Sequence, residues 1–409
     1  MPLILSIALF ILGAILGAAA NYSICRLRLR PRPISPWMRG DPPSPSRRWF
    51  DRVPIFGWLS MRRETPIFGP GFWMRPLLVE LLMGLGVAAL YRYEIQGGLL
   101  PADFPRPFAP DMLAMLHYQF AAHVVRIFLM TVASLIDADE SIIPDSITIS
   151  GTLVGLAFAA FCPRSLLPDP IPLPAGGFHV EIVNVASPNL WPVWLDLFGG
   201  LFIGLGCWLR WCFALLPRPW HTRHGLLRAL QLCGARIRRE TFSLLILGLA
   251  IFGIIAIAIC WRLGGAHWAG LLTALVGMAA GGGVVWAFRI LGSAVLKREA
   301  MGFGDVTLLA MIGAFVGWQA SLIIFFLSPF AALVVGLLRL VLFRQREIPF
   351  GPFLCLAALA TIFYWVSIWD RTLDVFALGW LVPLLLAGCF ALTPPLLYGM
   401  RIVTRCIGR

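Results

Sequence analysis

The amino-acid sequence predicts an all-α, polytopic membrane protein with about eleven transmembrane helices, its N-terminus outside and its C-terminus in the cytoplasm. The 409 residues are 59% hydrophobic and only 13% charged, with a mean hydropathy of +0.84, a composition that soluble globular domains do not show. Apolar runs of bilayer-spanning length recur along the whole chain. The net charge of +13 comes mostly from arginines between these runs, which indicates loops retained in the cytoplasm rather than nucleic-acid binding.

The first apolar run predicts a helix over about residues 3–24, which we expect to be retained because no basic residues precede it. A loop over about 25–75 follows, with eleven arginines against three acidic residues, so we expect it in the cytoplasm. A helix over about 76–92 then leads to an outside loop at 93–117 that is poor in arginine. The next helix, over about 118–136, returns to the cytoplasm.

The rest of the chain alternates in the same way. Further helices are predicted over about residues 145–162, 193–216, 241–261 and 268–290, with a proline- and glycine-rich outside loop at 163–192. Residues 306–343 are expected to form two helices broken near Gly317-Trp318, and the last two helices are expected over about 350–368 and 376–397. With this count, every arginine-rich loop lies in the cytoplasm.

Two aspartates lie at the ends of apolar runs, where a charge is costly and needs a reason. Asp137 ends the third run, and Asp305 opens a later one within Gly302-Phe303-Gly304-Asp305. Four predicted crossings separate them, an even number, so both are expected at the cytoplasmic face. Two carboxylates that share a proton can serve as the acid and the base of an aspartic protease, without a metal or a covalent nucleophile.

The spacing of these residues alone also allows other interpretations. Asp305 could cap the helix that follows it, and Asp139 and Glu140 are expected to be solvated residues at the membrane interface. A proton-coupled transporter would use Asp137 and Asp305 as a relay, although a relay predicts carboxylates at mid-bilayer and these lie at helix ends. A structural subunit of a secretion machine would need neither aspartate.

The two aspartate segments resemble those of the bacterial type IV prepilin peptidases, a family of GxGD intramembrane aspartic proteases. Asp137 followed by Ile143-Pro144 and Asp145 is similar to the family's first motif. Met301-Gly302-Phe303-Gly304-Asp305 is similar to the second. Residues 348–353 resemble a later family segment, and the N-terminal part is similar at Asn21, Asp51, Trp58 and residues 78–82.

The resemblance implies an aspartic endopeptidase of the bacterial inner membrane. Its substrates would be type IV prepilins or type II secretion pseudopilins, whose leader peptide it would remove at the cytoplasmic membrane face. Asp137 and Asp305 would be the catalytic pair, with Gly302, Gly304 and Pro144 as supporting motif residues. The implied partners are these substrates and the lipid bilayer, and no nucleic acid.

The resemblance also divides the chain into two regions. Residues 1–95 would form an N-terminal membrane region with a basic cytoplasmic loop, similar to the family's methyltransferase-like part. Residues 96–409 would form the catalytic domain, with an inserted helical hairpin and long loops.

The first cytoplasmic loop departs from the family pattern, in which two CxxC pairs often bind zinc. Ser35-Pro36-Trp37-Met38 stands where the first pair would be, and Thr65 and Phe68 stand where the second would be. We therefore expect no zinc, no cofactor for proteolysis, and a loop held by aromatic packing. S-adenosylmethionine would be a cofactor only if the N-methyltransferase activity of the family's loop is retained.

Overall fold

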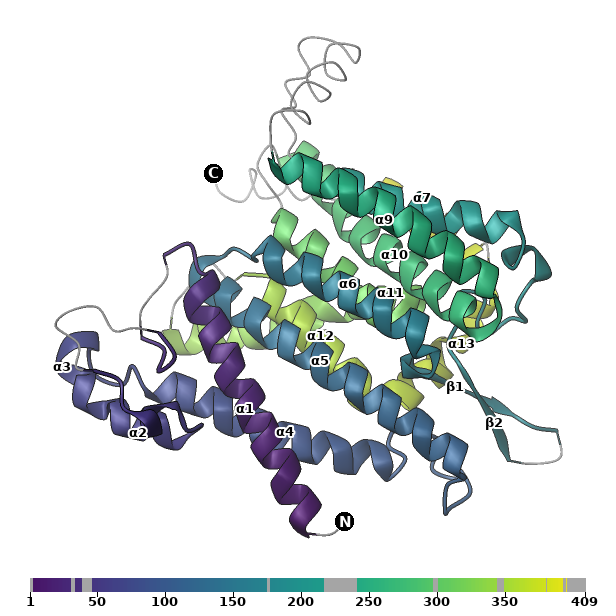
Figure 1. Cartoon of the computed structure of the whole chain (residues 1–409). Coiled ribbons are helices and arrows are strands. Elements are labelled where there is room, and N and C mark those ends of the chain that lie inside the picture. The colour runs from purple at the N-terminus through teal and green to yellow at the C-terminus, as the bar shows by residue number, and fades with distance from the viewer. Residues whose placement is uncertain are drawn as a thin grey trace.

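The computed structural model describes residues 3–30, 34–38, 46–174, 177–216, 241–296, 301–343, 349–379, 381–392 and 395. The described part is almost wholly helical, with one two-stranded sheet. Figure 1 shows the long helices lying side by side, with α1 and α4 at one side of the bundle and α7 and α9 at the other. The predicted all-α membrane fold is thereby confirmed in its class.

The N-terminal hairpin consists of α1 (Leu3–Leu27) and α4 (Met74–Ile95). Their backbones approach closely because α1 carries glycines at the contact. A Cβ atom on Gly17 would lie 2.6 Å from the Cα atom of Glu80. The described part of the connection contains four short helices: η1 (Trp49–Arg52), α2 (Phe56–Ser60), η2 (Met61–Glu64) and α3 (Thr65–Phe68).

The central helices are α5 (Pro110–Glu140), α6 (Asp145–Phe161), α10 (Gly265–Leu296), α11 (Phe303–Phe343) and α12 (Gly351–Phe363). In the most apolar stretch between Phe303 and Val334, 89% of the residues are buried. Helix α11 is therefore the core of the bundle. Gly317 has φ 80° and breaks α11 where the sequence predicted a break. That φ lies in the left-handed region, which glycine adopts without steric cost.

The other end of the bundle carries α7 (Phe198–Leu215), α9 (Thr241–Leu263), α13 (Trp365–Ala377) and the strands β1 (Pro168–Pro172) and β2 (Phe178–Ile182). The strands are antiparallel, with Pro170 opposite Val180. Two tryptophans of α13 fasten them to the bundle. Trp365 Nε1 donates to the carbonyl of Pro168 at 2.7 Å, and Trp369 Nε1 donates to Asp169 Oδ1 at 2.9 Å.

The number of crossings differs from the prediction. Among the described residues, seven helices are long and apolar enough to span a membrane, or up to eight if the bent pair α12 and α13 is one span. The expected eleven are not reached because α6 has only 17 residues, α11 counts as one helix, and the last apolar helix, Leu381–Leu392, is short. The chain bends by 96° between α12 and α13, so the predicted helix over 350–368 ends at Phe363.

Helix boundaries were predicted unevenly. The helix from Asp145 to Phe161 agrees with its prediction to one residue. In contrast, α5 begins at Pro110 rather than near 118, because its first two turns carry polar residues that the apolar run excluded. The loop predicted at 163–192 contains the strand pair. The strands were not predicted because prolines are uncommon within strands. The basic segment 217–240 and the C-terminal tail after residue 395 lie outside the described residues.

Candidate active site

Asp137 lies in the last turn of α5, where its side chain is almost fully buried at 5% exposure. Ser141 ends the helix in the left-handed conformation, with φ 54°. The N–H of Ser141 donates to the carbonyl oxygen of Asp137 at 2.8 Å. The carboxyl group therefore projects from a helix end whose backbone is closed by a hydrogen-bonded turn.

Asp305 lies in the first turn of α11 and is 6% exposed. Its carboxyl group is close enough to that of Asp137 for their charges to interact. Both carboxyl groups also lie close to the thiol of Cys355 in α12. Helices α5, α11 and α12 therefore bring the two predicted catalytic residues close to each other.

Ile143 is the residue that joins the two aspartate segments. A Cβ atom on Gly304 would lie 2.9 Å from the Cβ of Ile143 and 3.3 Å from its backbone nitrogen. Only glycine at position 304 allows the start of α11 to pack this closely on the link after α5. Pro144 then begins α6 as its N-cap residue, with an extended backbone of φ −66° and ψ 130°.

Gly302, the other predicted supporting glycine, has more room. It is exposed, and a Cβ atom there would make an ordinary contact of 3.5 Å with Asp305 Oδ2. The two glycines of the motif therefore differ, because close packing requires the absence of a side chain at Gly304 but not at Gly302.

Gly351 lies in the segment 348–353 that resembled the family, but no role at the site was predicted for it. Its backbone N–H donates to Asp137 Oδ2 at 3.1 Å, and a Cβ atom at this position would lie 2.5 Å from that oxygen. Gly351 opens α12, so the positive end of a helix faces the carboxyl group. The available signal was the Gly351-Pro352 pair, since proline is common in the first turn of a helix.

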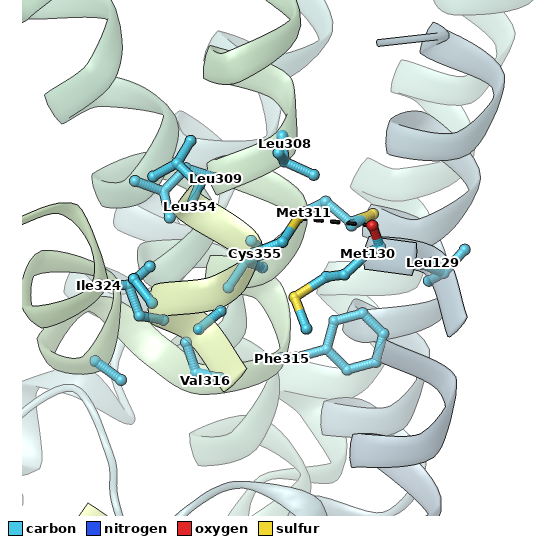
Figure 2. Packing of buried hydrophobic residues seen from close by; sticks show 14 of the residues in the cluster. Leu129, Met130, Leu308, Leu309, Met311, Phe315, Val316, Ile324, Leu354 and Cys355 are labelled. Carbon is cyan, nitrogen blue, oxygen red and sulfur yellow. Dashed lines mark hydrogen bonds between the residues drawn. The ribbon is translucent and has the colours of Figure 1, made fainter. Parts of the chain in front are cut away.

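Apolar side chains close the inner side of the site. Figure 2 shows Leu308 and Leu309 of α11, Leu354 and Cys355 of α12, and Met130 of α5 gathered in the buried cluster. The Sγ of Cys355 points to the carbonyl of Met130 at 3.6 Å (Figure 2). These side chains are almost fully buried, as are Asp137 and Asp305.

Asp139 is exposed and Glu140 is half-buried, as expected of interface residues, and both also bind the N-terminal hairpin. Asp139 is paired with Arg28 and, at 2.6 Å, with Arg75. Glu140 Oε2 accepts a hydrogen bond of 2.9 Å from the backbone N–H of Leu29. The end of α5 is therefore fastened to both helices of the N-terminal hairpin.

Buried carboxylates, and not aromatic packing alone, hold the loop between α1 and α4. Glu80 is 2% exposed and accepts hydrogen bonds from Trp58 Nε1 at 2.7 Å, from Asn21 Nδ2 at 3.1 Å and from the N–H of Ile55 at 2.5 Å. Glu64, fully buried, pairs with Arg47. The expectation that apolar packing holds this loop was therefore incomplete.

Asp51 forms a second buried network in the same loop. Arg63 donates to both carboxylate oxygens, at 2.9 Å and 2.5 Å, and Ser60 Oγ donates to Oδ1 at 2.6 Å. Burial alone would raise the pKa of Asp51, but the hydrogen bonds from Arg63, Ser60 and the Arg48 backbone lower it to about 2. Asp51 is thus a charged structural group within the folded loop.

The donor atoms of this loop do not fit a zinc tetrad. Cys25 is the one cysteine between residues 25 and 75, and the same stretch has no histidine. Two of its carboxylates, those of Asp51 and Glu64, are already engaged by arginines. Among the residues that the structure describes, no three His, Cys, Asp or Glu side chains gather as metal ligands. Tetrahedral zinc requires four such donors.

Comparison with known protein families gives a match for the segment that contains Asp305. Residues 239–337, which include Gly302, Gly304 and Asp305, match the model of the type IV leader peptidase family. This segment belongs to the type IV leader peptidase family. The family resemblance predicted from the motifs is thereby confirmed, while Asp137 lies outside the matched residues.

Individual proteins match this chain over stretches similar in length to the family match. Prepilin leader peptidase/N-methyltransferases of Aeromonas salmonicida and Burkholderia pseudomallei are 36% and 35% identical over 99 residues. These matches cover 23% and 24% of this chain, and 34% and 32% of the relatives. The corresponding protein of Pseudomonas aeruginosa is 41% identical over 78 residues, or 18% of this chain and 25% of the relative. The chain thus matches about a third or less of these relatives' length, and no solved structure matched it.

Proposed function

We propose that this protein is a membrane aspartic endopeptidase that removes the leader peptide of type IV prepilins or type II secretion pseudopilins. The observation that carries the proposal is the proximity of Asp137 and Asp305, two buried carboxyl groups that α5 and α11 bring close to each other. The family assignment of the segment containing Asp305 supports the same reaction.

Such a pair has the chemistry that peptide hydrolysis needs. Two nearby carboxyl groups do not both ionise, so one holds a proton while the other is a base. The base takes a proton from a water molecule, whose oxygen attacks the scissile carbonyl, and the protonated carboxyl group gives its proton to the leaving nitrogen. Gly351 holds one oxygen of Asp137, which leaves the other oxygen of that group for the shared proton or the water.

The proposed location is the bacterial inner membrane, with the site at the cytoplasmic face. Arginine is concentrated in the loop after α1, which carries eleven arginines between residues 25 and 75, and this distribution favours its retention in the cytoplasm. Asp137 and the N-terminal loop are held at the same end of the bundle by the pairing of Asp139 with Arg75. A substrate with an apolar helix would reach the site through the bilayer interface.

Co-expression with candidate prepilins tests the proposal. We expect a shorter, leader-free pilin on gels when the protein is present, and the unprocessed form when it is absent. A proton-coupled transporter that used the same aspartates would leave every prepilin unprocessed. No processing of any prepilin, by a protein shown to be inserted in the membrane, would overturn the proposal.

Methyl transfer is a separate activity of the relatives named above. If the loop of residues 25–75 retains it, S-adenosylmethionine supplies the methyl group and the mature pilin carries it on its new N-terminus. The mass of that N-terminus decides the question: the unmodified mass excludes methylation, and an increase by one methyl group establishes it.

A further inference from the structure

The end of α5 concentrates negative charge where a helix tolerates it least. Asp137, Asp139 and Glu140 all lie in its last turn, and that turn contains no basic residue. The carbonyl end of a helix is the negative end of its dipole, so acidic side chains there are destabilising and cations are stabilising. The turn that carries Asp137 therefore needs positive charge from elsewhere in the fold.

Two arginines of the N-terminal hairpin supply that charge. Arg75, at the start of α4, donates to Asp139 Oδ1 at 2.6 Å and to the carbonyl oxygen of Leu135 at 3.2 Å. Arg28, just after α1, pairs with the other oxygen of Asp139. The side chains of Arg28 and Asp139 are only 12% and 24% exposed, so water screens this pair less than it screens a surface pair.

The contacts reach the backbone of the turn as well as its side chains. The bond from Arg75 to Leu135 reaches a backbone carbonyl oxygen two residues before Asp137. The backbone N–H of Leu29 holds Glu140 at 2.9 Å. The close packing of α1 on α4 at Gly17 makes the hairpin that presents these donors a firm support.

We propose that Arg28 and Arg75 are positioning residues that fix the last turn of α5 and so the place of the Asp137 carboxyl group. This inference rests on the proposed proteolytic function. It also gives the N-terminal hairpin a part in proteolysis, because both arginines act on Asp137 through the backbone and the charges of its own helix turn rather than through contact with substrate.

The test compares purified, membrane-reconstituted variants by kcat and KM for a prepilin substrate. Arg28→Gln combined with Arg75→Gln should lower kcat by about tenfold to a hundredfold, since small displacements of catalytic groups cost this much. KM should change by less than about threefold, because the arginines do not meet the substrate. Arg26→Gln is the matched control: Arg26 lies in the last turn of α1 and donates to the Tyr22 hydroxyl at 3.0 Å, so kcat should be unchanged.

A second comparison separates positioning from general stability. In the Arg75→Gln background, Asp139→Asn should restore much of kcat, because it removes the acid that the arginine neutralises. Arg75→Lys should also keep more activity than Arg75→Gln, since lysine retains the positive charge.

Three results would overturn the inference. One is a wild-type kcat in the double glutamine variant. Another is a loss confined to the amount of folded protein, with kcat per folded molecule unchanged in Arg75→Gln. The third is a failure of Asp139→Asn to rescue Arg75→Gln. Activity that survives loss of the Asp137 carboxylate would instead contradict the proposed function.

Discussion

The backbone N–H of Gly351 donates a hydrogen bond of 3.1 Å to Oδ2 of Asp137, across 214 positions of sequence. This contact sets the orientation of one carboxyl group of the candidate pair. It also depends on the absence of a side chain, because any Cβ atom at position 351 would lie 2.5 Å from the same oxygen and 3.0 Å from Cδ1 of Ile143. A glycine that precedes a proline at the start of α12 is thus part of the site.

Gly351→Ala should therefore displace Asp137 and lower cleavage by about a hundredfold. The protein should still insert, because the change adds one methyl group at the end of a helix. The measurement is kcat with a purified prepilin, beside Gly86→Ala as the control. A Cβ atom at Gly86 of α4 meets no atom within 4 Å, so that variant should behave as wild type. Wild-type kcat for Gly351→Ala would show that the contact does not position Asp137.

The two motif glycines should respond differently to the same substitution. Gly304→Ala places a methyl group 2.9 Å from the Cβ of Ile143 and should separate the aspartate segments, with a loss of cleavage of at least about tenfold. Gly302→Ala makes only an ordinary contact of 3.5 Å and should cost less. Parallel cleavage assays on the two variants check this order, and the reverse order would contradict the packing described for Ile143.

The loop before α4 should loosen in acid because of Asp51. Its pKa is about 2 in the folded loop against an ordinary value of 3.8, so the charged form is favoured by folding. That contribution is fully present above about pH 4 and is lost as the pH falls towards 2. Hydrogen exchange over residues 46–68, corrected for the intrinsic effect of pH, should therefore rise between pH 4 and pH 2.

The Asp51→Asn variant is the control for this titration. It loses the ion pair with Arg63, so its exchange should already be high at neutral pH and should change less in acid. Equal exchange in both proteins at neutral pH would mean that Asp51 does not hold the loop.

Chelation should leave cleavage intact. The loop offers Cys25 as its one thiol and no histidine, and its carboxylates Asp51 and Glu64 are engaged by arginines. Elemental analysis of the purified protein should find less than one zinc per chain, with equal activity before and after treatment with a chelator. Stoichiometric zinc, with activity that a chelator removes and zinc restores, would refute this prediction.

The sequence was sufficient to find the two aspartates because each combines a charge with the end of an apolar run. It also located the break at Gly317, since a glycine beside a tryptophan interrupts an otherwise continuous run. The family resemblance covered both aspartate segments, whereas the family match extends over residues 239–337 and so includes Asp305 alone of the pair.

Contacts made across the fold could not be found in this way. The bond between Gly351 and Asp137, and the pairing of Arg75 with Asp139, join positions that no local pattern connects. The number of crossings was overestimated because hydropathy does not distinguish a full span from a shorter apolar helix such as Leu381–Leu392. The strand pair was missed because prolines weaken the alternation by which strands are recognised.

The central claim is that Asp137 and Asp305 together hydrolyse the leader peptide bond. Its most direct test is the cleavage of a prepilin by purified Asp137→Asn and Asp305→Asn, each shown to be inserted and folded, beside Asp145→Asn. Asp145 is exposed at the start of α6 and makes no capping bond there, so its variant should retain activity. We predict that neither Asp137→Asn nor Asp305→Asn releases detectable leader peptide. Cleavage by either of these variants at a rate near that of the wild type would contradict the assignment.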